Sequence, residues 1–163
     1  MADGTVAAAW VQAIGSIAGV LIAIYVPVRM RRVEEYDRRR DVVSTISQLK
    51  RMGDEYVRAL THGTMAVHAG VPPPGFRALE QSLRVSLVSG VPAELIPAAV
   101  KAADAAKLVV EHWELQASSG NTANPALINT AQLRQANVVR ALADAQIALR
   151  RWKRSHRITL WFA

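Results

Sequence analysis

The pattern of apolar and polar positions divides the chain near residue 30. Residues 4–28 contain no charged side chain, and only Thr5, Gln12 and Ser16 among them are polar. About 20 consecutive apolar residues are enough for an α-helix to cross the hydrocarbon core of a bilayer. The pattern therefore predicts an N-terminal tail and a transmembrane anchor over residues 1–30.

The residues that flank this stretch predict its orientation. Trp10 and Tyr25 lie near its two ends, where amphipathic aromatic rings favour the headgroup level. Positive charge follows the stretch directly, at Arg29, Arg31 and Arg32, whereas no Lys or Arg precedes it. The positive-inside rule then predicts a single-pass protein with its N-terminus outside and its C-terminus in the cytoplasm.

The stretch has two alternative interpretations. A cleaved signal peptide has positive charge before its apolar core and a small-residue cleavage site after it, and residues 1–32 have neither feature. The other alternative is the buried core helix of a soluble domain. It is disfavoured because no other helix of such length in the chain is apolar on every face.

Small residues recur four apart within the predicted anchor, at Gly15, Gly19 and Ala23. Such a GxxxG pattern forms a flat stripe that lets two membrane helices approach closely. We therefore expect a homo-oligomer that associates through these three residues. The alternative is that Gly and Ala are simply frequent in membrane helices.

Residues 31–163 predict one helical domain. Between residues 42 and 60, apolar residues alternate at spacings of four and three, which is typical of one buried helical face: Val42, Ile46, Leu49, Gly53, Tyr56 and Leu60. Gly53 is a thin spot in this stripe. Upstream, the stripe meets Arg39, Glu35 and Arg32, so we expect that part to be a solvated stalk that packs against nothing.

Three further helices follow from the same kind of pattern. The PPPG stretch within residues 61–75 predicts a loop, and residues 76–89 predict a short helix ending at Gly90. Pro92 or Pro97 opens a third, Ala-rich helix, whose apolar seam is Leu95, Ala99, Ala102, Ala106, Val109 and Trp113. Residues 125–153 predict a fourth helix, whose seam is Val138, Leu142, Ala145, Leu149 and Trp152. No strand signal is present. The predicted fold is all-α, with the transmembrane helix followed by a cytoplasmic antiparallel bundle of about four helices.

The net charge of +7 is concentrated in two short segments. Six Arg lie within residues 29–40 and five Lys or Arg within residues 150–157, whereas residues 41–149 hold nine basic and nine acidic side chains. An up-down-up-down bundle returns the second segment to the membrane, where anionic headgroups attract it. The predicted membrane-surface residues there are Arg150, Arg151, Lys153, Arg154, Arg157, Trp161 and Phe162. The alternative is a basic tail in solvent.

The chain offers little for catalysis. It has no Cys, no phosphate-binding glycine motif and no HExxH or GxSxG motif. His62 and His68 lack companion ligands at metal-binding spacing, and Glu111, His112 and Glu114 read as part of a polar helix surface. Ser47 and Lys50 match only a short and common S-x-x-K pattern. We therefore predict a non-enzyme with no catalytic residues, no cofactor and no metal.

The W-x-Q-A-I sequence that begins at Trp10, followed by an Arg-rich stalk, resembles small bacterial single-pass membrane proteins of unassigned function. Some of these occur among prophage and phage-defence genes. The resemblance covers about the first 40 residues and implies a bacterial inner-membrane location.

We favour an interaction module that holds itself or a cytoplasmic partner protein at anionic lipid. The first alternative is a holin-like or toxin-like oligomer that perturbs the bilayer. The second is a nucleic-acid-binding protein, which the neutral middle of the chain argues against.

Overall fold

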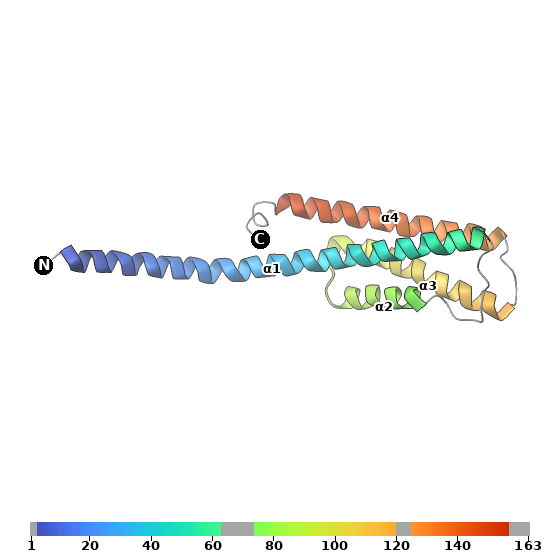
Figure 1. Cartoon of the computed structure of the whole chain (residues 1–163), viewed down its shortest axis with the longest axis horizontal. Helices are drawn as coiled ribbons and strands as arrows, with labels where there is room; N and C mark the ends of the chain where they lie inside the picture. Colours follow the sequence, from blue (N-terminus) through green and yellow to red (C-terminus); the bar gives the residue numbers. More distant parts are fainter. Residues whose placement is uncertain (1–2, 63–73, 120–124, 157–163) are drawn as a thin grey trace. The chain divides into compact units, whose positions relative to one another are not determined.

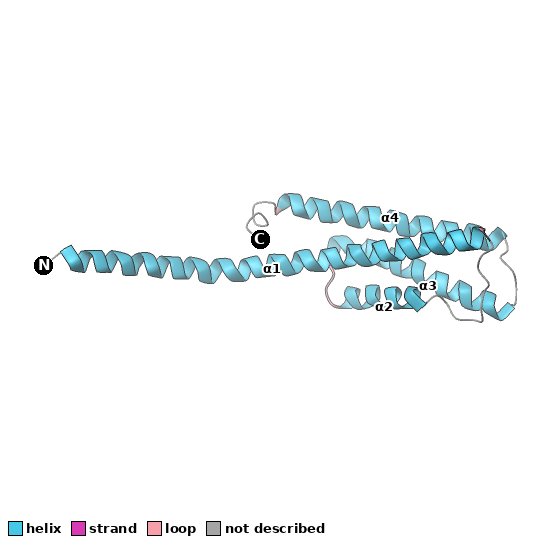
Figure 2. Ribbon diagram, in the orientation of Figure 1, coloured by secondary structure: helices cyan, strands magenta, loops and turns pink. Residues whose placement is uncertain are grey.

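The computed structural model describes residues 3–62, 74–119 and 125–156. These residues form the long helix α1 (Asp3–Thr61), helix α2 (Pro74–Val88), a short 3-10 helix η1 (Ala93–Leu95), helix α3 (Ile96–Ser119) and helix α4 (Pro125–Ser155) (Figures 1 and 2). No strand occurs within the described ranges. The predicted all-α class is confirmed.

The chain divides into two compact units, which we describe separately. The described part of the first unit is the N-terminal portion of α1, up to Asp37. The second unit covers Arg38–Arg157 and contains the rest of α1 together with α2, η1, α3 and α4. The boundary after Asp37 lies seven residues later than the limit at residue 30 that the sequence pattern predicts.

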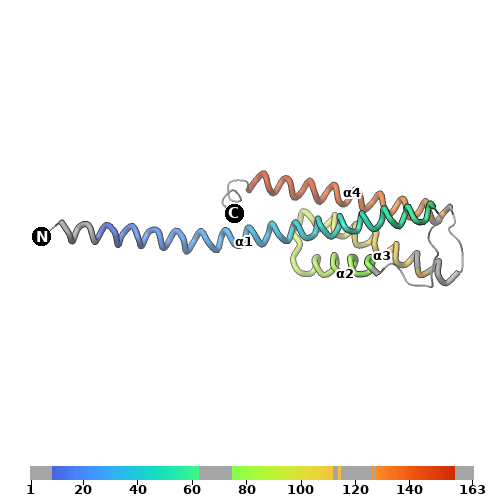
Figure 3. Tube along the Cα trace, in the orientation of Figure 1, coloured from blue at the N-terminus to red at the C-terminus, as the bar shows by residue number. Residues whose placement is uncertain are grey.

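The second unit is an antiparallel helical bundle, as predicted (Figure 3). Successive helices run in opposite directions, because residues late in one helix contact residues early in the next, and the reverse. The contacts that show this are the aromatic pair Tyr56–Phe76 and the ion pairs Arg77–Glu114, Arg84–Asp104 and Lys101–Asp144.

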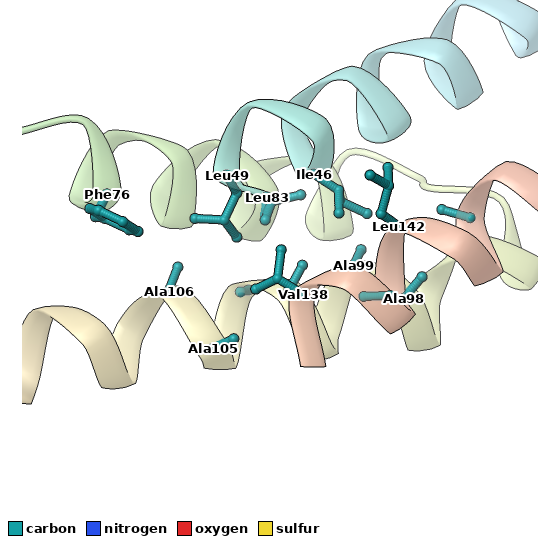
Figure 4. Close-up of a cluster of buried hydrophobic side chains, with 14 of the residues drawn as sticks. Ile46, Leu49, Phe76, Leu83, Ala98, Ala99, Ala105, Ala106, Val138 and Leu142 are labelled. Carbon is teal, nitrogen blue, oxygen red and sulfur yellow. The ribbon is translucent and has the colours of Figure 1, made fainter. Parts of the chain in front are cut away.

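The predicted stripe of α1 faces the core of this bundle. Its five side-chain positions from Val42 to Leu60 are all buried, and Ile46 has no exposed surface. Leu83 of α2, Ala99 of α3 and Val138 of α4 meet it (Figure 4). Each helix therefore contributes its 3.6-period apolar face to one shared core.

Helix α3 is buried over a wider face than the sequence predicts. The predicted seam included Ala99, Ala102 and Ala106, and all three are buried. Three more alanines beside this seam are buried as well: Ala98, Ala103 and Ala105. The reason is that α3 packs against both α2 and α4. Side chains as short as Ala allow small distances between helix axes on both sides.

At Gly53 a side chain of α4 lies directly against the backbone of α1. A Cβ atom placed on Gly53 would collide with Oε1 of Gln135. The Gln135 amide lies over this glycine and donates from Nε2 to the carbonyl of Lys50 at 2.8 Å and to Asp54. The predicted thin spot is thus filled by a hydrogen-bonded side chain from α4.

Proline and glycine delimit the shorter helices. Pro74 is the first residue of α2, and Gly90 beyond its end has φ of 95°, a conformation that favours glycine. Pro92 precedes η1 and Pro97 is the second residue of α3, so both candidate prolines act at the start of this segment. Helix α1, in contrast, continues through Pro27.

Candidate membrane-contact site

The charge-free part of α1 is the one stretch among the described residues that is long and apolar enough to cross a membrane. None of its most apolar 18-residue window is buried within the structure. Ile17 and Leu21, near its middle, are 62% and 61% exposed. The alternative of a buried core helix does not fit this exposure, because a core helix hides its apolar side chains from solvent.

Ser16, one of the few polar residues in the stretch, has its hydroxyl satisfied locally. The Ser16 Oγ atom donates to the backbone carbonyl of Gln12 at 2.8 Å, one helical turn earlier. A hydroxyl that is bonded within its own helix costs less to transfer into lipid than an unpaired one. This polar position is therefore compatible with a lipid environment.

The small-residue stripe at Gly15, Gly19 and Ala23 is open. All three residues are exposed, and a Cβ atom on Gly15 or Gly19 would meet no atom within 4 Å. Neither glycine is thus required by packing within the chain. The predicted self-association through this stripe stays a prediction.

The buried position of Arg39 contradicts the prediction that this part of α1 is a solvated stalk. Arg39 is 8% exposed and is the one charged residue in the buried class among those described. Its Nε and Nη2 atoms donate to Oε1 of Glu94 at 3.1 and 2.9 Å. Its guanidinium also lies over the indole of Trp152, 4.7 Å from the ring centroid, which is a cation–π geometry. We call the three residues the Arg39 clasp.

The Arg39 clasp joins three elements of the bundle: α1, η1 and α4. His156 extends it, because its imidazole stacks on Trp152 with ring centroids 4.5 Å apart. The pKa of Glu94 reflects two opposing effects. Partial desolvation raises the pKa, but hydrogen bonds from the backbone and from Arg39 lower it below the usual value. Glu94 is therefore a stable anionic partner at neutral pH.

The position of Arg39 explains why the sequence pattern missed the clasp. Arg39 lies three residues before Val42, in register with the buried stripe, but a charged side chain at such a position ordinarily indicates exposure to solvent. Its two partners lie 55 and more than 100 residues further along the chain, so no local pattern reports them. The residue from which the clasp could have been inferred is Trp152, because its spacing places it on the apolar seam of α4 and no polar partner for it is evident in the sequence.

The end of the second unit that holds the clasp is rich in exposed cations. Arg38 and Arg40 flank Arg39 on α1, and the contact between Arg39 and Trp152 places the last turns of α4 beside them. We define the basic end by six exposed residues: Arg38, Arg40, Arg150, Arg151, Lys153 and Arg154. The structure thus brings the second predicted basic segment to the Arg38–Arg40 part of the first.

The remaining predicted surface residues are not tested by this arrangement. Arg29, Arg31 and Arg32 belong to the first unit, where they lie on α1 just after the apolar stretch. Arg157, Trp161 and Phe162 lie outside the described residues. Their contact with a membrane surface stays a prediction.

A surface groove of about 600 Å³ lies beside the clasp. Both of its carboxylates face cations from outside the groove, since Glu94 pairs with Arg39 at 2.9 Å and Asp144 approaches Lys101 at 3.9 Å. Arg151 is the remaining charged residue of its lining. The residues that line it are Glu94, Asp144, Ile147, Ala148, Arg151, Trp152 and Ser155.

The candidate chemical groups named from the sequence occupy ordinary surface positions where they are described. Glu111 pairs with Lys107 at 3.2 Å, and Glu114 pairs with Arg77. Lys50 pairs with Asp54 in the next turn, where this hydrogen bond lowers the Asp54 pKa. The side chain of His112 and the whole of His68 lie outside the described residues, and no group of three potential metal ligands occurs among the rest.

Comparison with known proteins adds no relative to this picture. No protein-family model, no curated protein and no solved structure matches the chain.

Proposed function

We propose that the protein is a single-pass inner-membrane protein whose helical bundle lies in the cytoplasm. In this proposal the bundle is an interaction module without catalytic activity, which holds itself or a partner protein at the membrane. The observation that supports it most is the continuous, charge-free and exposed apolar part of α1. A soluble protein rarely leaves so large a contiguous apolar surface in water.

The free energy involved supports lipid as the solvent of this segment. Nine aliphatic side chains between Val11 and Val28 are 44–71% exposed: Val11, Ile14, Ile17, Val20, Leu21, Ile22, Ile24, Val26 and Val28. Burying one such side chain fully is worth about 1.5–3 kcal/mol, so burying their exposed parts is worth on the order of 10 kcal/mol. An energy of this size favours a bilayer over water by many orders of magnitude.

The proposed orientation follows from the charges on the two sides. Arg29, Arg31 and Arg32 follow the apolar stretch on α1, and no Lys or Arg precedes it. Short cytoplasmic segments of membrane proteins carry such an excess of positive charge. This asymmetry supports an external N-terminus and a cytoplasmic second unit.

The anchor and its orientation can be tested together. In a bacterial host, the full chain should remain in the membrane pellet after alkaline carbonate extraction. A reporter that is active only in the cytoplasm should be active when fused after Ser155 and inactive when fused before Gly4. Release of the intact chain into the soluble fraction would contradict the anchor, and the reverse reporter pattern would contradict the orientation. Rapid collapse of the membrane potential on expression would favour the bilayer-perturbing alternative instead.

Self-association through the small-residue stripe needs its own test. Gly15→Leu with Gly19→Leu would place two bulky side chains on the stripe, where the structure leaves open space. We expect this pair to lower self-association in a membrane two-hybrid assay, because the helices can no longer approach closely. Ala13→Leu with Ile17→Leu is the matched control, since these residues lie on the opposite helical face. Equal signals from the two double variants would remove the stripe from the proposal.

A further inference from the structure

We infer that the basic end of the second unit is a docking surface for anionic phospholipid headgroups. This inference rests on the proposed membrane anchor and names a second, peripheral contact with the same bilayer. Its residues come from two helix ends that lie more than 100 residues apart in the sequence, Arg38 and Arg40 on α1 and Arg150–Arg154 on α4.

Most cations elsewhere in the bundle are neutralised by a carboxylate. Lys50, Arg77, Arg84, Lys101 and Lys107 each have a carboxylate oxygen within 4 Å. At the basic end, by contrast, Arg38, Arg40, Arg151 and Arg154 form no ion pair with any residue in the described ranges. The positive charge of this end therefore remains available to an external anion.

The acidic residues near the basic end do not cancel this charge. Glu94 is occupied by the buried Arg39, and Asp144 faces Lys101 rather than the arginines of α4. Asp41 is exposed on α1. Asp37, which directly precedes Arg38 on α1, is exposed as well. Six exposed cations thus share the surface with two carboxylates that have no cationic partner among the described ion pairs. A surface of this composition attracts a layer of phosphates more strongly than it attracts a zwitterionic layer.

The Arg39 clasp holds the two groups of cations of the docking surface together before lipid binds. Arg39 lies between Arg38 and Arg40 in the sequence, and it is fixed against Trp152, which lies between Arg151 and Lys153. Both groups of cations are therefore held together before any ligand binds, so binding does not have to order the two helix ends. Ile147, which is 41% exposed in the neighbouring groove, adds an apolar side chain beside Arg151. Cations beside apolar groups are typical of surfaces that lie in a membrane interface.

The covalent connection makes lipid the favoured anion. Nine residues separate Val28, at the end of the apolar stretch, from Arg38. Ten peptide steps span at most about 35 Å, so the basic end stays near the bilayer surface whatever the arrangement of the two units. A tethered surface meets headgroups at a high effective concentration, which no free phosphate compound in solution matches.

The docking surface can be tested with the full chain in vesicles. The chain has no cysteine, so a single cysteine at Ser155 can carry a fluorescent donor, with acceptor dye on the lipids. Gln132, exposed near the other end of α4, provides the matched label position. We expect energy transfer from position 155 to be greater in vesicles that contain phosphatidylglycerol than in pure phosphatidylcholine. The excess should fall at high salt, and position 132 should show no such dependence.

A pair of charge variants distinguishes this surface from general electrostatic attraction. Arg40→Gln, Arg151→Gln and Arg154→Gln together should lower the contact equilibrium by about a hundredfold, which is the effect of three cations at an anionic surface. Arg51→Gln, Arg58→Gln and Arg140→Gln remove the same charge from exposed positions elsewhere in the bundle and should leave the transfer unchanged. Equal losses in the two triple variants, or equal transfer in the two lipid compositions, would overturn the inference. Pelleting after carbonate extraction reports the anchor separately, so a failure of one does not pass for a failure of the other.

Discussion

The two parts of α1 show how one continuous helix can meet two different environments. Before Asp37 its apolar side chains are distributed over every face, and all those described between Ala9 and Val28 are exposed. After Arg38 apolar residues occupy one face, recur every three or four positions and are buried. Backbone hydrogen bonding is the same in both parts. The side-chain pattern therefore distinguishes the part of α1 that other helices cover from the part that they leave exposed.

The largest difference between the two parts should appear when charge is introduced. Ile17→Asp with Leu21→Asp should release the chain from the membrane, because each aspartate near the centre of a membrane helix costs about 2.5–3.5 kcal/mol. Carbonate extraction measures the retained fraction. Gln48→Asp with Ser44→Asp makes the same change on the exposed face of the packed part and should leave retention intact. Retention of the first variant would mean that lipid does not solvate the apolar part.

Removing apolar volume should destabilise the bundle when the change is in the packed part of α1 and not when it is in the exposed part. Ile46→Ala should lower the free energy of unfolding of the bundle by about 2–5 kcal/mol, because Ile46 is fully buried and its loss leaves a cavity. Ile17→Ala makes the same change at an exposed position of the first unit and should leave the bundle's thermal midpoint unchanged. Thermal unfolding in detergent, followed by circular dichroism, compares them. Equal shifts in the midpoint would show that the two units unfold as one.

Adding a single methyl group should also have different effects on stability in the two parts of α1. Gly53→Ala should destabilise the bundle by about 1–3 kcal/mol, because the new Cβ atom would collide with the Gln135 amide. Gly15→Ala should have no such effect, since no atom lies within 4 Å of its Cβ position. In a Gln135→Ala background the cost of Gly53→Ala should largely disappear. A cost that persists there would place its cause outside the contact with Gln135.

The smallest effect is expected at the junction of the two parts, in the Arg39 clasp. Glu94→Gln should cost about 1 kcal/mol at neutral pH, since the Glu94 carboxylate is 44% exposed and water screens the pair. The pKa of Glu94 is lowered by folding, so its contribution is present above the unfolded pKa and is lost as pH falls through the folded value. The difference in thermal midpoint between wild type and variant should thus vanish in acid. A difference that is constant down to pH 3, roughly one unit below an ordinary Glu pKa, would contradict this assignment.

Much of the fold could be predicted from the sequence, because spacing is a local property. The stripes of α1 and α4 are buried as their periods predict, and Gly90 ends α2 in the left-handed conformation. The two-sided burial of α3 could not be predicted, because Ala is short enough to suit both a packed and an exposed face. Helical spacing shows which residues share a face but not how many neighbours that face will have.

The candidate site was less accessible to prediction than the fold. The apolar stretch and the two basic segments are visible in composition alone, and the bundle topology correctly brings the second segment to Arg38–Arg40. The clasp was missed because charge was read as a sign of solvent, although a guanidinium can be buried when a carboxylate and an aromatic face satisfy it. The filling of Gly53 by Gln135 was missed for a related reason, since a polar amide replaced the expected apolar contact.

The Arg39 clasp has a mechanical consequence for the helix that carries it. Each residue of an α-helix is rotated by about 100° from the one before, so a twist of α1 by one residue would carry the guanidinium away from Trp152. A slide by one turn would separate Arg39 from Glu94 by about 5 Å, beyond the reach of the ion pair. Rotation or sliding of α1 within the bundle is therefore opposed by the contacts of this one side chain with Trp152 and Glu94.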